Sequence, residues 1–139
     1  WDVPIKLISG SIFDRKGAVV RDATLYPTQP LYADITLPPG AQIFLPIDVA
    51  HNAFLVVFRE SVTLGGSLVP TRHMAILGND PQSTGVLLEA PASNGADARV
   101  LLISGRPLRE PIAQYGPFVM NTRDQLIQAV EDFQAGKMG

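Results

Sequence analysis

The two histidines of the chain, His51 and His73, are the side chains best suited to chemistry. An imidazole can ligate a metal or carry a proton near neutral pH. A metal centre needs several ligands together, and these two histidines are far apart in a chain that has no His-x-His pair. We interpret His51, between a loop and an apolar strand, as a structural residue that fixes the loop, with a vestigial site as the alternative. His73, which follows Arg72, is interpreted as a solvated or half-buried histidine.

Other catalytic patterns are missing from the sequence. The chain has no cysteine, which excludes disulfides and thiol nucleophiles. It has no Gly-x-Ser-x-Gly elbow, and the glycines at 65 and 66 are typical of a hairpin turn rather than a phosphate loop. Arg59 and Glu60 are adjacent at a strand end, so their side chains should point to opposite faces. We therefore predict no catalytic residue in this chain.

A small charged cluster, Arg106, Arg109 and Glu110, precedes the C-terminal segment. The simpler interpretation is a solvated connection, and the alternative is an inter-domain contact. The 11 basic and 13 acidic residues give a net charge of −2 and form no basic stripe, so direct nucleic-acid binding is not expected.

Length and composition predict one folded domain over 139 residues. The longest apolar run, 53–58, is far below the ~20 residues that cross a bilayer, so no membrane span is expected. The chain opens on Trp1 without a signal-peptide pattern. We expect a fragment of a longer protein, with a processed chain as the alternative, located in the cytoplasm, or in the nucleus if the source is eukaryotic.

Short apolar–polar alternations separated by glycine and proline predict an all-β domain, either a sandwich or a barrel. The alternation is clearest over 31–37, with a return strand at 41–45 after the Pro-Pro-Gly turn. The unbroken apolar run 53–58 predicts a strand covered on both faces. Further strands are expected at 5–13 (interrupted at Gly10), 61–64, 73–77, 85–89 and 99–104.

The pattern changes to helical spacing near the end of the chain. Leu126, Ile127, Val130 and Phe133 share one helix face. Thr122 and Gln125 are spaced as a capping box, and Gly136 is placed to end the helix in a left-handed conformation. One helix is predicted over about 122–135.

The C-terminal segment also resembles a known family. Residues 110–123 read EPIAQYGPFVMNTR and residues 129–136 read AVEDFQAG, which together look like the C-terminal hallmark of the pirins. The segment that leads into this hallmark, 102–108, resembles the second domain of the same family. So do the upstream segments 45–46 and 51–54. The resemblance covers about residues 5 to 139.

The resemblance implies a cupin-type β-barrel or sandwich of jelly-roll kind with one C-terminal α-helix. Pirins are bicupins, with two barrels in tandem, so residues 1–139 are expected to be a single cupin-like domain equivalent to the second barrel. Three histidines and a glutamate in the first barrel hold iron or another divalent metal. The His-Pro-His-Arg-Gly motif of that barrel is absent from this sequence.

A cupin metal site would need ligands that this chain does not offer. In an approximate alignment with the cupin motifs, the carboxylate position falls at Phe54 and the third histidine at Ala75, followed by Asn79. Among positions 47–50 only Asp48 could ligate. We therefore expect no metal-binding residue, no cofactor-binding residue and no cofactor in this chain. The resemblance implies that iron or another divalent metal is held by an N-terminal domain, which we expect to precede this chain in the longer protein.

The hallmark itself is interpreted as a structural segment. Residues 115–118, Tyr-Gly-Pro-Phe, are expected to cross one barrel end, plug it and lead into the helix. A ligand-binding role for Tyr115 is the alternative.

Three functions remain open. The first is a non-catalytic structural and protein-interaction domain, whose partners are the N-terminal cupin and a regulatory protein or metabolic enzyme. The second is part of a flavonol (quercetin) 2,3-dioxygenase whose metal lies in the other domain. The third is a stand-alone small cupin that binds an apolar ligand. An uncovered inter-domain surface also predicts self-association of the chain.

Overall fold

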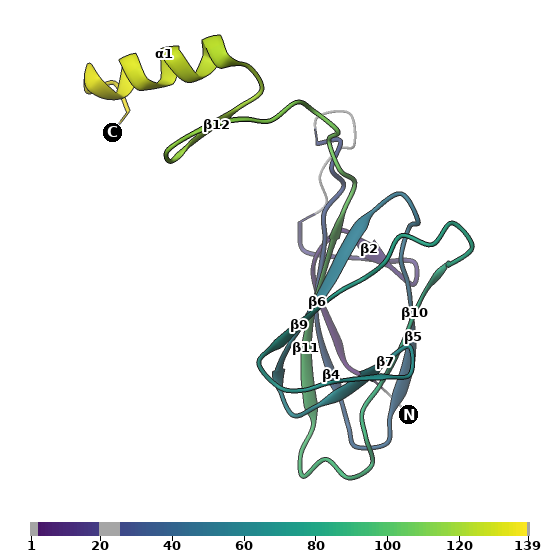
Figure 1. Cartoon of the computed structure of the whole chain (residues 1–139). Coiled ribbons are helices and arrows are strands. Elements are labelled where there is room, and N and C mark those ends of the chain that lie inside the picture. The colour runs from purple at the N-terminus through teal and green to yellow at the C-terminus, as the bar shows by residue number, and fades with distance from the viewer. Residues whose placement is uncertain (1–2, 20–25, 139) are drawn as a thin grey trace. The chain divides into compact units, whose positions relative to one another are not determined.

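The structure is a computed structural model that describes residues 3–19 and 26–138. The chain forms two compact units, Trp1–Pro107 and Leu108–Gly139 (Figure 1). Among the described residues, no helix is both long and apolar enough to cross a membrane.

The first unit consists of two antiparallel sheets and a small hairpin, which confirms the predicted all-β architecture. Three strands, β4 (Leu31–Leu37), β11 (Ala98–Gly105) and β6 (Asn52–Arg59), lie inside the five-stranded sheet, and each pairs on both sides. That sheet has the order β1 (Ile5–Ser9), β4, β11, β6 and β9 (His73–Ile76). The four-stranded sheet has the order β5 (Gln42–Pro46), β10 (Gly85–Glu89), β7 (Val62–Leu64) and β8 (Ser67–Val69), and the hairpin is β2 (Ser11–Ile12) with β3 (Arg15–Lys16).

Apolar alternation places the core between the two sheets. In β4 every second residue is fully or almost fully buried, and the residues between them are half-buried. The same alternation runs through β11. Because successive strand residues point to opposite faces, one face of each strand supplies the core. The largest side chains buried there are Ile35, Leu37, Leu45, Leu55, Leu88, Leu102, Val57, Val62 and Val100.

Strand β6 corrects one sequence prediction. The run 53–58 was expected to be covered on both faces, but only Ala53, Leu55 and Val57 are buried. Phe54 and Val56 are half-buried and Phe58 is 40% exposed. The prediction was wrong because only one face of β6 meets the core of this unit. Apolar cross-strand neighbours, such as Ile103 and Ile76 on either side of Phe54, partly shield the other face.

Turn residues divide the other predicted strands. The expected strand at 5–13 is split into β1 and β2 at Gly10, whose φ of 82° is unfavourable for other residues. The predicted hairpin turn at 65–66 joins β7 to β8, and both glycines have positive φ. The strands predicted at 31–37 and 85–89 have the observed bounds, and those at 41–45, 73–77 and 99–104 differ by one residue at their ends.

The second unit consists of the hairpin β12 (Ala113–Tyr115) and β13 (Phe118–Met120), followed by α1 (Arg123–Gln134). The predicted capping box is confirmed, because the Gln125 N–H donates to the Thr122 hydroxyl and the Gln125 side chain accepts from the Thr122 N–H. Gly136 follows the helix with a φ of 69°, as predicted.

The hallmark segment 115–118 is the turn of a two-stranded hairpin in the second unit, with Tyr115 opposite Phe118 and Gly116 at positive φ. The side chain of Tyr115 is exposed. The expected plug at one barrel end stays a prediction. The run carries no helical or long-strand pattern of its own, and the Gly-Pro pair allows the chain to reverse within four residues.

Candidate functional site

The inner face of the five-stranded sheet is where a cupin-type site would have to be built. Leu55 on β6 lies opposite Ala75 on β9 and opposite Leu102 on β11. Two residues before Leu55 on β6, Ala53 lies opposite Ser104 on β11. Because directly opposed residues project from the same face of a sheet, these positions share the buried side. The face therefore presents alkyl groups, and its one polar member among these is the Ser104 hydroxyl.

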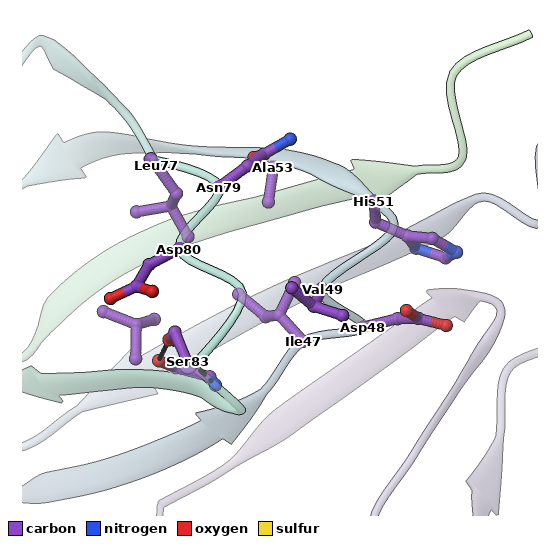
Figure 2. A pocket seen from close by; sticks show the side chains of 12 residues that line it. Ile47, Asp48, Val49, His51, Ala53, Leu77, Asn79, Asp80 and Ser83 are labelled. Atoms are coloured by element: carbon purple, nitrogen blue, oxygen red, sulfur yellow. Dashed lines mark hydrogen bonds between the residues drawn. The ribbon is translucent and has the colours of Figure 1, made fainter.

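A hollow of about 150 Å³ opens at one end of this face (Figure 2). It lies between the turn that joins β5 to β6 and the loop that follows β9. The turn contributes Ile47, Asp48, Val49 and His51, and the loop contributes residues 77–80 and Ser83. This hollow brings together three positions singled out in the sequence, namely Asp48, His51 and Asn79.

Three polar side chains of this hollow make hydrogen bonds to nearby groups. The Asp48 carboxylate accepts from the Ala50 N–H at 2.9 Å, and its carbonyl accepts from the His51 N–H at 2.9 Å. Asp80 accepts from the Gln82 N–H at 2.9 Å. The two aspartates thus stabilise turns, as short polar side chains commonly do. Asn79 instead donates through Nδ2 to the Asn52 side-chain oxygen at 3.0 Å, which links the loop after β9 to the start of β6.

The directions of these side chains also separate them. Figure 2 shows the His51 ring and the Asp48 carboxylate projecting to the same side, whereas the Asp80 carboxylate lies on the opposite side of the hollow. Among residues 3–19 and 26–138, no three His, Cys, Asp or Glu side chains are grouped so that they could hold a metal ion.

The predicted motif register needs one correction. Phe54 was assigned to the carboxylate position, but it lies on the outer face of β6, away from the buried row of Ala53, Leu55 and Val57. Ala75, assigned to the third histidine position, does lie on the inner face opposite Leu55. A one-residue change of register would exchange the two faces of this strand.

His51 is the site residue with the most unusual surroundings. Its Nδ1 lies 3.5 Å from the Oγ of Ser104, a long hydrogen-bond distance. Its Nε2 is buried and has no hydrogen-bond partner among the residues that the structure describes. Ser104, only 4% exposed, was not singled out in the sequence analysis, because a serine within an apolar strand carries no signal of its partner.

The remaining candidates lie elsewhere. His73 is exposed on the edge strand β9, with Nδ1 3.0 Å from the Thr71 carbonyl, which agrees with its interpretation as a solvated histidine. Glu60 follows β6 in a left-handed turn conformation. In the second unit, Glu110 accepts from the Asn121 side chain at 2.9 Å. Arg106 belongs to the first unit, whereas Arg109 and Glu110 belong to the second.

One feature of the outer sheet face also escaped the sequence analysis. Arg99 on β11 pairs with Asp34 on β4, and the Arg99 guanidinium lies 4.9 Å from the centre of the Phe58 ring. Arg99 and Asp34 are far apart in the chain and meet only through the β4–β11 pairing. The pair is partly exposed and links two neighbouring strands of the sheet.

Comparisons with known proteins agree on the kind of domain. Residues 32–139 match the family model described as the pirin C-terminal cupin domain. A pirin-like protein of Solanum lycopersicum is 36% identical over 99% of this chain and 45% of its own length. Human pirin is 34% identical over 99% of this chain and 45% of its own length. The chain thus spans a little under half the length of these curated relatives.

A solved structure gives the same result for the fold. The crystal structure of a quercetin 2,3-dioxygenase from Acinetobacter baumannii superimposes with a TM-score of 0.79 at 30% sequence identity. The match covers 97% of this chain and 43% of that protein.

Proposed function

The chain belongs to the pirin family as its C-terminal cupin domain, and from this premise we propose that it is a non-catalytic structural and interaction domain. Its first partner is the N-terminal cupin of a longer protein, which supplies the metal site. The second is a regulatory protein or a metabolic enzyme. The observation that carries the proposal is the inner sheet face, where Leu55, Ala75 and Leu102 stand in one row.

Alkyl side chains on that face argue against a catalytic metal in this domain. A catalytic iron or similar ion needs imidazole and carboxylate ligands that converge and leave open positions. Asp48 and His51 lie at the rim, and Asp48 is exposed. Two such side chains fall short of the usual set. We therefore derive no step of a reaction through a metal held by this chain.

A second candidate function is favoured by the likeness to the Acinetobacter quercetin 2,3-dioxygenase. In that case the longer protein oxidises a flavonol, and this domain shapes the cavity of its neighbour. Iron or another divalent metal would then be held entirely by the N-terminal cupin. The third candidate, a stand-alone cupin that binds an apolar ligand, has less support because the curated relatives are about twice as long.

Metal analysis of the purified chain tests the main proposal. After incubation with iron, zinc or copper and dialysis, elemental analysis should find much less than one metal per chain. A matched sample of the His51→Phe variant should give the same result as the wild type. A stoichiometric metal that survives dialysis in the wild type but not in the variant would overturn the proposal.

Activity on quercetin separates the first two candidates. The chain alone should not consume quercetin, with or without added iron. The same assay on the longer protein that contains both cupin domains tests whether that protein oxidises quercetin. Quercetin loss in the presence of the chain alone, after removal of contaminating metalloenzymes, would contradict the non-catalytic assignment.

A further inference from the structure

The outer face of the five-stranded sheet, the side that points away from the core, carries two apolar rows. Cross-strand pairing aligns Leu101, Val56 and Met74 in one row, and Ile103, Phe54 and Ile76 in the other. Exposure of these side chains rises toward the edge strand β9, where Met74 is 57% and Ile76 is 77% exposed. Adjoining apolar side chains on a protein surface commonly mark an interaction site.

Basic side chains lie beside these rows. Arg99 is on the outer face, because it pairs with Asp34 and lies 4.9 Å from the centre of the Phe58 ring. Arg59 is exposed, lies opposite Arg99, and has no ion-pair partner among the described residues. Within the five strands of this sheet, Lys6, Arg59 and Arg99 are basic and Asp34 is the only acidic residue. The sheet is therefore positively charged, although the whole chain has a net charge of −2.

Apolar rows beside guanidinium groups fit one kind of partner best. A sheet buries an apolar face against a helix or another sheet, and a carboxylate complements a guanidinium in charge and geometry. An anionic membrane fits less well, because lipid recognition of this kind uses clusters of about 4–8 basic residues. A second copy of the chain would supply apolar contacts, but it would bring further basic groups instead of carboxylates.

We propose that the outer face docks an amphipathic helix of a partner protein, which places its apolar side on the two rows and a carboxylate beside Arg59. This inference rests on the proposed interaction role and names the chemistry of the regulatory protein or enzyme that would bind. The apolar rows supply most of the affinity, as central apolar contacts do in other interfaces. The exposed guanidinium of Arg59 selects acidic partners and speeds their association.

Two synthetic amphipathic helices test this surface. Both have the same leucine face, and the polar face carries glutamate in one peptide and lysine in the other. By fluorescence anisotropy of the labelled peptides, the glutamate helix should bind the chain about tenfold more tightly than the lysine helix. High salt should reduce that difference, because salt screens exposed charges. Equal affinities of the two peptides, or no binding of the glutamate helix, would overturn the proposal.

Variants of exposed residues locate the binding on this face. Ile76→Ser and Arg59→Glu should each weaken binding of the glutamate helix about fivefold or more. The matched controls are Leu68→Ser on β8 of the other sheet, where Leu68 is 63% exposed, and Arg15→Glu on the exposed strand β3. Both controls should bind as the wild type does, and thermal unfolding confirms that each variant is folded. If Arg59→Glu does not fold, Arg59→Gln should still reduce the preference for glutamate over lysine. Unchanged affinity in a folded Ile76→Ser, or an unchanged preference in the folded Arg59 variant, would overturn the proposal.

Other occupants of the face give different results. Vesicles of phosphatidylserine and phosphatidylcholine should not compete with the glutamate helix, and the peptide should convert associated chains to monomers. The longer protein with both cupin domains should bind the peptide as the chain alone does. Competition by vesicles, a dimer that excludes the peptide, or loss of binding in the longer protein would assign the face to a membrane, a second copy or the N-terminal cupin. Each of these results would overturn the proposal, whereas the non-catalytic assignment is decided separately by the metal and quercetin assays.

Discussion

Leu55 on β6 and Ala75 on β9 face each other across the inner side of the five-stranded sheet. Leu55 is 1% exposed, and its other cross-strand neighbour, Leu102, is fully buried. The position assigned from the cupin motif to a metal-binding histidine is thus part of an apolar row. These buried alkyl side chains stabilise the fold.

Leu55→Ala should therefore lower the free energy of unfolding of the first unit by about 2–5 kcal/mol, because it opens a cavity in the core. Val56→Ala, one residue further along the same strand, removes an outward side chain and should cost clearly less. Urea titrations of both variants measure the difference. Equal losses would mean that the two faces of β6 are equally packed.

The helix of the second unit should be stabilised by an aromatic pair. Phe118 and Phe133 meet edge to face with ring centres 5.8 Å apart, although Phe133 is 60% exposed. Such pairs contribute about 0.5–1.5 kcal/mol beyond their burial. A double-mutant cycle with Phe118→Leu and Phe133→Leu, followed by amide exchange in α1, should give a coupling in this range. Additive effects would show that the two rings do not interact.

The end of the helix depends on the left-handed conformation of Gly136. Apart from its chain neighbours, no described residue has an atom within 4 Å of the place that a Cβ would occupy there, so the expected cost of a side chain comes from the backbone. Gly136→Val should destabilise the last turn by about 1–2 kcal/mol, because a β-branched residue resists positive φ. Gly136→Asn should cost less, since asparagine tolerates this conformation. Helical circular dichroism and amide exchange of residues 130–136 compare the two, and equal effects would contradict the backbone argument.

The chain should self-associate through the outer face of the five-stranded sheet. Cross-strand pairing lines up Ile103, Phe54 and Ile76 on that face, with Ile76 77% exposed on the edge strand. A net charge of −2 offers little repulsion. Sedimentation over a concentration series should show association, and Ile76→Lys should shift the chain toward monomer. Lys6→Arg, which keeps the charge on another edge strand, is the control.

An ideal monomer at high concentration would contradict this prediction. Association that persists unchanged in Ile76→Lys would instead place the contact elsewhere, with the exposed side chains of Ile127 and Val119 as the next candidates.

Much of the fold could be predicted because its signals are local. The capping box joins Thr122 to Gln125, three residues away, and the stop at Gly136 depends on one backbone conformation. In β4, apolar residues occupy every second position, and this alternation indicates which face of the strand is buried. Within such short spans, backbone geometry and side-chain chemistry leave few alternatives.

The candidate site depends on contacts that join distant parts of the chain. Ser104 reaches His51 only because β11 pairs with β6, and Phe54 faces outward only because of the register of that pairing. In an apolar run such as 53–58, the residues on both faces of the strand are apolar. The sequence alone therefore predicts a strand but not which of its faces is buried. Long-range packing determines which face of β6 is buried. It therefore also determines that the inner face carries alkyl side chains, and that Nε2 of His51 has no hydrogen-bond partner among the described residues.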